Sequence, residues 1–135
     1  MSDSLRLEVV TPSRRVLESR ASEVRIPGAL GELGVLPGHT PLLTSLGTGE
    51  VIWFDGNTTG RLVVQGGFAE IQPDAVTVLA SVAEAVEEID VEAARTTLAE
   101  AQEKLKTVSA DEFDEIDGHA KLAEARINAA AGSTG

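Results

Sequence analysis

The distribution of glycine and proline divides this chain into two unlike parts. All five prolines and most of the glycines lie before about Ala83, whereas from there to Gly118 neither residue occurs and Ala, Glu and Lys dominate. Frequent glycine and proline interrupt short extended segments, and a long stretch without them in this composition is typical of helix. The sequence therefore predicts a β-rich part, which we place at residues 1–86, and a helical part at residues 87–135.

Apolar residues alternate with polar ones, or form short runs, through the first part. Leu5, Leu7 and Val9 alternate with charged residues, and Val24 and Ile26 flank an arginine. The turn sequences DGNTTG and QPDA join later segments into hairpins. These later segments are 51–54, which is predicted to be a short buried run, 62–64, 68–71 and 76–79. Short strands with regular turns predict an antiparallel sandwich or a flattened barrel.

The second part shows two apolar seams with three-four spacing, which predict an antiparallel helical hairpin. Asp90 is the expected N-cap of the first helix, and Ser109 with Glu112 is the expected capping box of the second. Both seams are rich in alanine, which buries little apolar area, and Gly118 weakens the second helix by about 1 kcal/mol relative to alanine. We therefore predict a hairpin of marginal stability. The seam residues are Val91, Ala94, Leu98, Ala101, Leu105 and Val108, then Phe113, Ile116, Ala120, Ala123, Ile127 and Ala130.

The net charge of the chain limits its partners. At −11 it argues against nucleic acid or an anionic lipid surface as the main partner, because both attract Lys and Arg. The lack of cysteine excludes a disulfide framework and a thiolate metal site, and it fits a reducing compartment. The apolar stretches are far shorter than the roughly 20 residues of a membrane helix. No basic, apolar leader follows Met1.

The loop GELGVLPGHTPLL at 31–43 is the most conspicuous candidate for a binding function. Its glycines match neither the P-loop nor the dinucleotide fingerprint, and its prolines bracket a turn instead of opening a helix. We therefore predict a turn that shapes a contact, not a phosphate cradle. His39 and His119 lack metal-binding or triad spacing, and the acidic run 111–117 lacks the spacing of a calcium loop. The residues predict no catalytic residue and no metal site.

Several stretches together resemble the epsilon subunit of the bacterial rotary ATP synthase. They are LRLEVVTPSRRV at 5–16, the loop at 31–43, GGFAEIQPDAVTVLA at 66–80 and the alanine-rich hairpin, and they cover essentially the whole chain in order. The resemblance implies an N-terminal antiparallel β-sandwich of about ten short strands, followed by a two-helix hairpin. It also implies a non-catalytic rotor subunit of a proton-translocating ATP synthase. Such a subunit lies on the central stalk at the cytoplasmic face of the bacterial plasma membrane.

The resemblance implies partners for both parts of the chain. The sandwich would join the gamma subunit to the c-ring, and the chain would meet the membrane only through that complex. Glu32 is implied to face the polar loops of the ring, where its acidic charge would meet basic groups. The hairpin is implied to be regulatory: it lies folded against the sandwich or extends toward the alpha and beta subunits of the catalytic head, where it obstructs hydrolysis. The residues implied to shape the contact beside Glu32 are Leu33, His39, Thr40, Pro41 and Leu42.

Some relatives bind ATP on the folded hairpin through an I-D-x-x-R-A motif. Here Ile89, Asp90 and Ala94 match the motif, Ala93 stands where arginine belongs, and Arg126 matches a second-helix arginine. No cofactor is predicted, and ATP as a regulatory ligand is left open. The second helix carries few basic groups amid many acids, so we predict that its inhibitory hold on the head is weak or needs another factor.

Two other function classes are weighed against the rotor subunit. A free-standing nucleotide-sensing or adaptor module would bind its ligand on the hairpin, but the motif arginine and an anion-binding loop are missing. A small β-sandwich enzyme would need a catalytic site that the sequence does not contain. Association with stalk and c-ring proteins distinguishes the rotor subunit from both.

Overall fold

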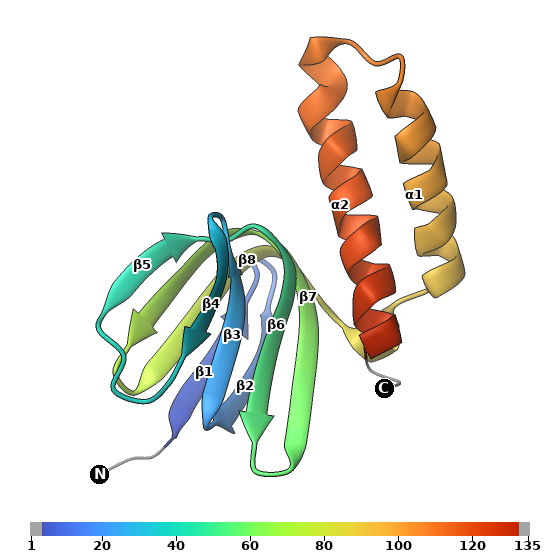
Figure 1. The fold of residues 1–135 in the computed structure, drawn as a ribbon. Coiled ribbons are helices and arrows are strands. Elements are labelled where there is room, and N and C mark those ends of the chain that lie inside the picture. The colour runs from blue at the N-terminus through green and yellow to red at the C-terminus, as the bar shows by residue number, and fades with distance from the viewer. Residues whose placement is uncertain (1–3, 133–135) are drawn as a thin grey trace.

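A computed structural model describes residues 4–132, which form eight strands and two long helices (Figure 1). Residues 1–3 and 133–135 lie outside the described residues, and so does the start of the chain, on which the prediction about a leader depends. The strand order is β2-β1-β8-β7-β6-β3-β4, and β5 pairs with β7. The strands form a sandwich, so this part of the predicted fold is confirmed. Their bounds are β1 (Leu5–Val10), β2 (Arg15–Ala21), β3 (Glu23–Gly28), β4 (Gly31–Val35), β5 (Leu42–Ser45), β6 (Thr48–Asp55), β7 (Thr58–Gln72) and β8 (Ala75–Ala85).

The expectation of about ten short antiparallel strands needs two corrections. Two of the predicted short segments, 62–64 and 68–71, belong to the single strand β7, and β8 continues well past the predicted 76–79. The count is therefore eight. Moreover, β1 pairs with β8 in parallel, although all other strand pairs are antiparallel within the described residues.

Strands β7 and β8 are long because each crosses from one layer of the sandwich to the other. The first half of β7 pairs with β6, and its second half pairs with β5. The buried positions change parity along the way: Leu62 and Val64 face the core in the first half, but Ala69 and Ile71 do so in the second. The change falls at Gly66 and Gly67, whose φ values of 70° and 101° allow the turn from one layer to the other.

The core lies between the two layers and contains most of the apolar positions predicted from alternation. Leu5, Leu7 and Val9 are fully buried, as are Val24 and Ile26. The predicted buried run 51–54 is wrong in part, because only Val51 is buried and the next three side chains are half-buried. They belong to β6, in which alternate side chains face away from the core.

The helical part begins later than the composition suggested. The stretch after Ala83 is still strand, and a short 3-10 helix, η1 (Val86–Glu88), leads to α1 (Val91–Leu105) and α2 (Ala110–Gly132). Asp90 caps α1 as predicted, since its Oδ1 accepts a hydrogen bond from the Ala93 amide at 3.0 Å. At the start of α2, Ser109 and Glu112 contact each other differently from the predicted box. The Ser109 hydroxyl donates to the Glu112 carboxylate (3.4 Å), and the Glu112 amide donates to the Ser109 carbonyl (3.1 Å).

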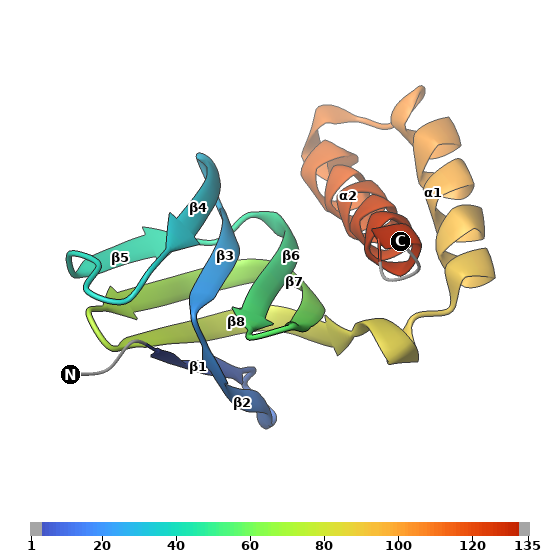
Figure 2. The same ribbon diagram turned by 60° about the horizontal axis from the view of Figure 1, so that its bottom comes forward.

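The helix α2 lies between α1 and the sandwich, so it buries two faces where the seam predicted one (Figure 2). Ala120 and Ala123 are buried as predicted, but Leu122, Ala125 and Ala129 are buried as well. The predicted seam also fails at Phe113, whose side chain is 44% exposed near the start of α2. Among the larger contacts between elements of residues 4–132, α1 packs against α2 alone.

Candidate protein-interaction surfaces

The segment 31–43, which was predicted to be a loop that shapes a contact, is a loop only in part: residues 31–35 form β4, residues 42–43 begin β5, and residues 36–41 form a braced turn between them. The amide of Gly38 donates to the Pro73 carbonyl (2.7 Å), and the amide of His39 donates to the Leu36 carbonyl (3.1 Å). The His39 ring bonds locally, because its Nδ1 lies 2.6 Å from the Thr40 carbonyl oxygen and donates to it. These bonds fix the turn against the β7–β8 connection, as a stiff contact surface requires.

The predicted contact residues differ in exposure and do not all lie together. Glu32 is exposed on β4, and no residue in the described range 4–132 forms an ion pair with it. Leu33 is half-buried and packs against the sandwich core. Thr40, Pro41 and Leu42 are exposed and His39 is half-buried.

Glu32 lies at the end of the sandwich opposite the loop that contains His39. The turn before β4 bonds to the end of β5, since the Ala29 amide donates to the Ser45 carbonyl (2.9 Å). The loop 36–41 precedes the start of β5, so β5 separates it from that turn (Figure 1). The structure therefore offers two contact regions where the sequence suggested one.

An apolar strip on the outer face of the sandwich was missed by the sequence analysis. We define it by Leu43 on β5, Phe68 on β7 and Leu79 on β8, whose exposed fractions are 67%, 52% and 48%. Phe68 pairs with Leu79 across the two strands, and Leu79 pairs with Val10 of β1. A signal for it existed in the sequence, because Phe68 and Leu79 are large apolar residues at positions where alternation requires a solvent-facing side chain. Large apolar side chains exposed on one face of a sheet indicate a protein contact.

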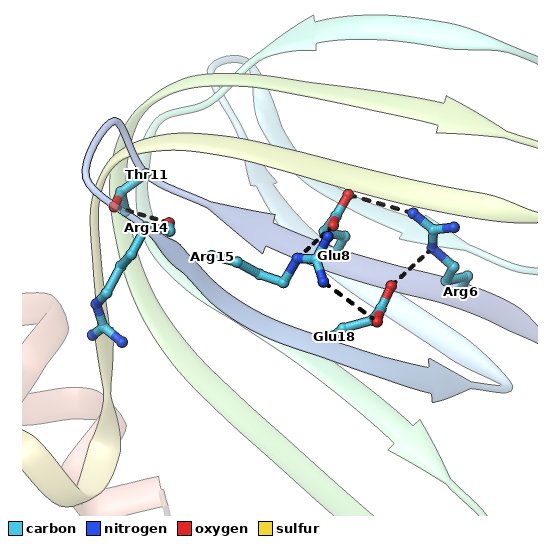
Figure 3. A network of polar contacts seen from close by, with 6 residues as sticks. All are labelled: Arg6, Glu8, Thr11, Arg14, Arg15 and Glu18. Carbon is cyan, nitrogen blue, oxygen red and sulfur yellow. Dashed lines mark hydrogen bonds and ion pairs between the residues drawn. The ribbon is translucent and has the colours of Figure 1, made fainter.

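Beside the strip, two arginines and two glutamates form a closed network of ion pairs across β1 and β2 (Figure 3). Arg15 Nε lies 2.9 Å from Glu8, and Arg6 Nε lies 3.4 Å from Glu18. The charges compensate within the network, in which Glu8 is mostly buried and the other three side chains are exposed. This part of the face therefore presents little net charge to a partner.

Contacts that hold the hairpin to the sandwich within residues 4–132 include an apolar cluster and two polar contacts. In the cluster, Val63 of β7 is fully buried against Leu122, Ala125 and Ala129 of α2. Gln65 Nε2 donates to the Gly118 carbonyl (2.9 Å), so the glycine lies where α2 approaches β7.

The second polar contact is an ion pair between α2 and β8. Arg126 donates from Nε and Nη2 to the two carboxylate oxygens of Glu84, at 2.7 Å and 3.0 Å. Both side chains are mostly buried, so this bidentate pair is stronger than an ordinary surface pair. The Arg126–Glu84 ion pair and the hydrogen bond from Gln65 to Gly118 together hold the folded hairpin on the sandwich.

The residues of the possible ATP motif already have intramolecular partners. The Asp90 carboxylate caps α1, and the Arg126 guanidinium is bound by Glu84. Ala94 is buried at the α1–α2 contact, and Ile89 packs against the Val63 cluster. The four residues are thus spread over the base of the hairpin, and both of their charged groups are engaged there.

Comparison with known proteins places this fold in a family. A family model described as the ATP synthase delta/epsilon chain, beta-sandwich domain, matches residues 4–86. The chain belongs to the ATP synthase delta/epsilon family. An ATP synthase epsilon chain of Geotalea uraniireducens is 43% identical over 112 residues, which are 83% of this chain and 81% of that protein.

Other relatives extend the match through the hairpin. An ATP synthase epsilon chain 2 of Syntrophotalea carbinolica is 39% identical over 132 residues, or 96% of each chain. One chain in the structure of the Euglena gracilis mitochondrial ATP synthase, OSCP/F1/c-ring, has a TM-score of 0.85 at 23% identity. The matched region covers 96% of this chain and 82% of the Euglena chain. That structural likeness covers both helices as well as the sandwich.

The side chains and helices of residues 4–132 also bear on metal binding and on membrane insertion. No group of three His, Asp or Glu side chains in this range is arranged to hold a metal ion. Neither α1 nor α2 is long and apolar enough to cross a membrane.

Proposed function

We propose that the chain is a non-catalytic rotor subunit of a proton-translocating ATP synthase, on its central stalk at the cytoplasmic face of a bacterial plasma membrane. The observation that carries the proposal is the 39% identity with an ATP synthase epsilon chain over 96% of both chains. In this proposal residues 1–86 couple the gamma subunit to the c-ring, and residues 87–135 regulate hydrolysis by the alpha and beta subunits.

The exposed surfaces of the sandwich support a coupling role. Glu32 has no ion-pair partner among residues 4–132 and can meet a basic loop, hydrogen bonds brace the turn around His39, and the apolar strip exposes three large side chains on one face. Transmission of torque requires such fixed surfaces and no chemical step. Glu32 and His39 would therefore bind partner subunits and take no part in a reaction.

Reversal of the charge at Glu32 tests the proposed ring contact. We expect Glu32→Lys to weaken binding to a detergent-solubilised assembly of gamma subunit and c-ring about tenfold, because a favourable charge contact becomes a repulsive one. The matched control is Glu87→Lys, which makes the same charge change on the exposed η1 helix. Equal affinities of the two variants, measured by biolayer interferometry, would contradict the ring contact.

The charges of α2 support a weak regulatory hold. Lys121 is paired with Asp117 (3.0 Å), and Arg126 is paired with Glu84, so both cations of the central part of α2 have partners in the folded hairpin. Extension of the hairpin toward the catalytic head would break the Arg126 pair. That cost opposes inhibition in the extended state.

Removal of the hairpin tests the weak hold. We expect the ATPase rate of the reconstituted catalytic head to differ less than about twofold between the full chain and residues 1–88, because a weak hold leaves few heads inhibited. The control is the head without either protein. Activation by several-fold on truncation would contradict this proposal.

For ATP, we expect no binding to the natural chain at millimolar concentration. Ala93 supplies no cation, and Arg126 and Asp90 are engaged within the protein. Calorimetric titration with ATP of the natural chain and of Ala93→Arg measures binding directly. Binding by the variant alone would show that the motif arginine is the group that the natural chain lacks. Binding by the natural chain would show that the hairpin senses nucleotide without that arginine.

A further inference from the structure

We propose that the unpaired edge of β8 between Ala80 and Glu84 binds an extended, acid-bearing segment of a neighbouring ATP synthase subunit, which adds to the sheet as a strand. The inference rests on the proposed function for the identity of the complex. It concerns a surface to which neither the sequence motifs nor the hairpin contacts assign a role.

The edge is open because β1 stops pairing with β8 before β8 ends. The parallel pairing runs from Arg6 with Ala75 to Val10 with Leu79 and stops there. Beyond that point β8 pairs only with β7 on its other side, among the residues that the structure describes. In a strand every second residue directs its amide and carbonyl to the same side, so this stretch presents unpaired backbone groups to a partner.

The open stretch also lacks the features that usually protect such an edge. Ala80, Ser81, Val82 and Ala83 include no lysine, no proline and no long side chain. Glu84, which closes the stretch, is held by Arg126 at the hairpin. An edge without these protections is a template for strand addition unless a partner covers it.

A groove runs along this edge. Its other wall is the turn between β1 and β2, which two backbone hydrogen bonds between Thr11 and Arg14 hold rigid (2.9 and 3.3 Å). Two adjoining hollows of about 300 and 350 Å³ share Thr11, Pro12 and Ser81 in their walls. The groove continues to Leu79, so it adjoins the apolar strip.

The charge at the mouth of the groove indicates an acidic group on the occupant. Arg14 lines one hollow, and its guanidinium forms no ion pair with any residue from 4 to 132. Figure 3 shows this side chain extending away from the Arg6–Glu8–Arg15–Glu18 network, whose own charges are compensated. A second copy of a chain with net charge −11 would meet general repulsion, whereas a local carboxylate on another subunit would pair with Arg14.

Hydrogen–deuterium exchange of the chain, free and within the assembled ATP synthase, tests the proposal. We expect those amides of 80–84 that point to the open edge to exchange at least about tenfold more slowly in the complex, whereas the alternate amides, which point to β7, should change little. We also expect Arg14→Glu to weaken binding to the synthase lacking this subunit about tenfold, with no change for Arg20→Glu, a matched exposed arginine on β2.

Each contrary result has a distinct meaning. If the complex forms but the 80–84 amides stay unprotected, or if the two arginine variants bind equally, the edge contact is wrong and the proposed function stands. If protection appears in the free chain with rising protein concentration, the occupant is a second copy and the proposal is overturned. If the chain does not enter the complex at all, both proposals fail.

Discussion

Gly67→Ala is expected to destabilise the sandwich by about 4 kcal/mol, near the upper end of single-residue effects. Gly67 lies at the corner of β7 with φ at +101°, and an added Cβ would come 1.9 Å from the Leu79 carbonyl oxygen. That oxygen belongs to the paired backbone of β8, so it cannot move without opening the sheet. Urea unfolding followed by the fluorescence of the single tryptophan, Trp53, measures the loss.

The control for this substitution is Gly56→Ala. Gly56 also has a positive φ, +63°, but nothing lies within 4 Å of its added Cβ. Only the backbone conformation is penalised there, at about 1 kcal/mol. If both variants lose the same free energy of unfolding, close approach at the β7 corner does not explain the glycine at 67.

Val63→Asp is expected to release the hairpin while the sandwich stays folded. Val63 is fully buried under α2 and lies outside the main core cluster, so an aspartate there loses water only while the hairpin is docked. Burial of the carboxylate without a partner costs about 3 kcal/mol or more, which undocking avoids. Hydrogen exchange should therefore accelerate across α1 and α2 and remain unchanged in β1 and β8.

Thr59→Asp is the matched control on the same strand. Thr59 is exposed beyond the reach of the cluster, so its substitution should leave exchange in both helices unchanged. Retained protection of α2 in Val63→Asp would show that the Arg126–Glu84 pair and the Gln65 contact hold the hairpin without the apolar cluster.

The local patterns of the sequence predicted elements well where one face of an element is buried. Alternation placed Leu5, Leu7 and Val9 in the core, and the acidic residue at position 90 marked the start of α1. These signals depend on neighbours along the chain. They require no knowledge of which elements pack together.

Alternation failed where an element has two partners. The run 62–64 is apolar throughout because Leu62 and Val64 face the core while Val63 faces α2. Likewise the seam of α2 omitted Leu122, because that side chain packs on the sandwich and not on α1. Such an element packs against two partners that are distant in sequence. Its apolar residues therefore follow two overlapping periodic patterns, one for each buried face, and a search for a single pattern misses some of them.

The candidate surfaces were the least predictable feature. The segment 31–43 was identified by its composition, but the separation of Glu32 from the turn that contains His39 depends on how β4 and β5 pair with different strands. The open edge of β8 follows from the point at which β1 leaves it, and that point is set by the register of a parallel pair. Registers between strands distant in sequence are not encoded in any local motif.

ATP-driven proton pumping tests the central claim, that this chain couples the rotor, most directly. The synthase is assembled in vesicles without this subunit, and the chain is then added back while proton uptake and ATP hydrolysis are recorded together. The account predicts that pumping per ATP hydrolysed is low without the chain and rises when it is added. Pumping that is equally efficient with and without the chain would contradict the account.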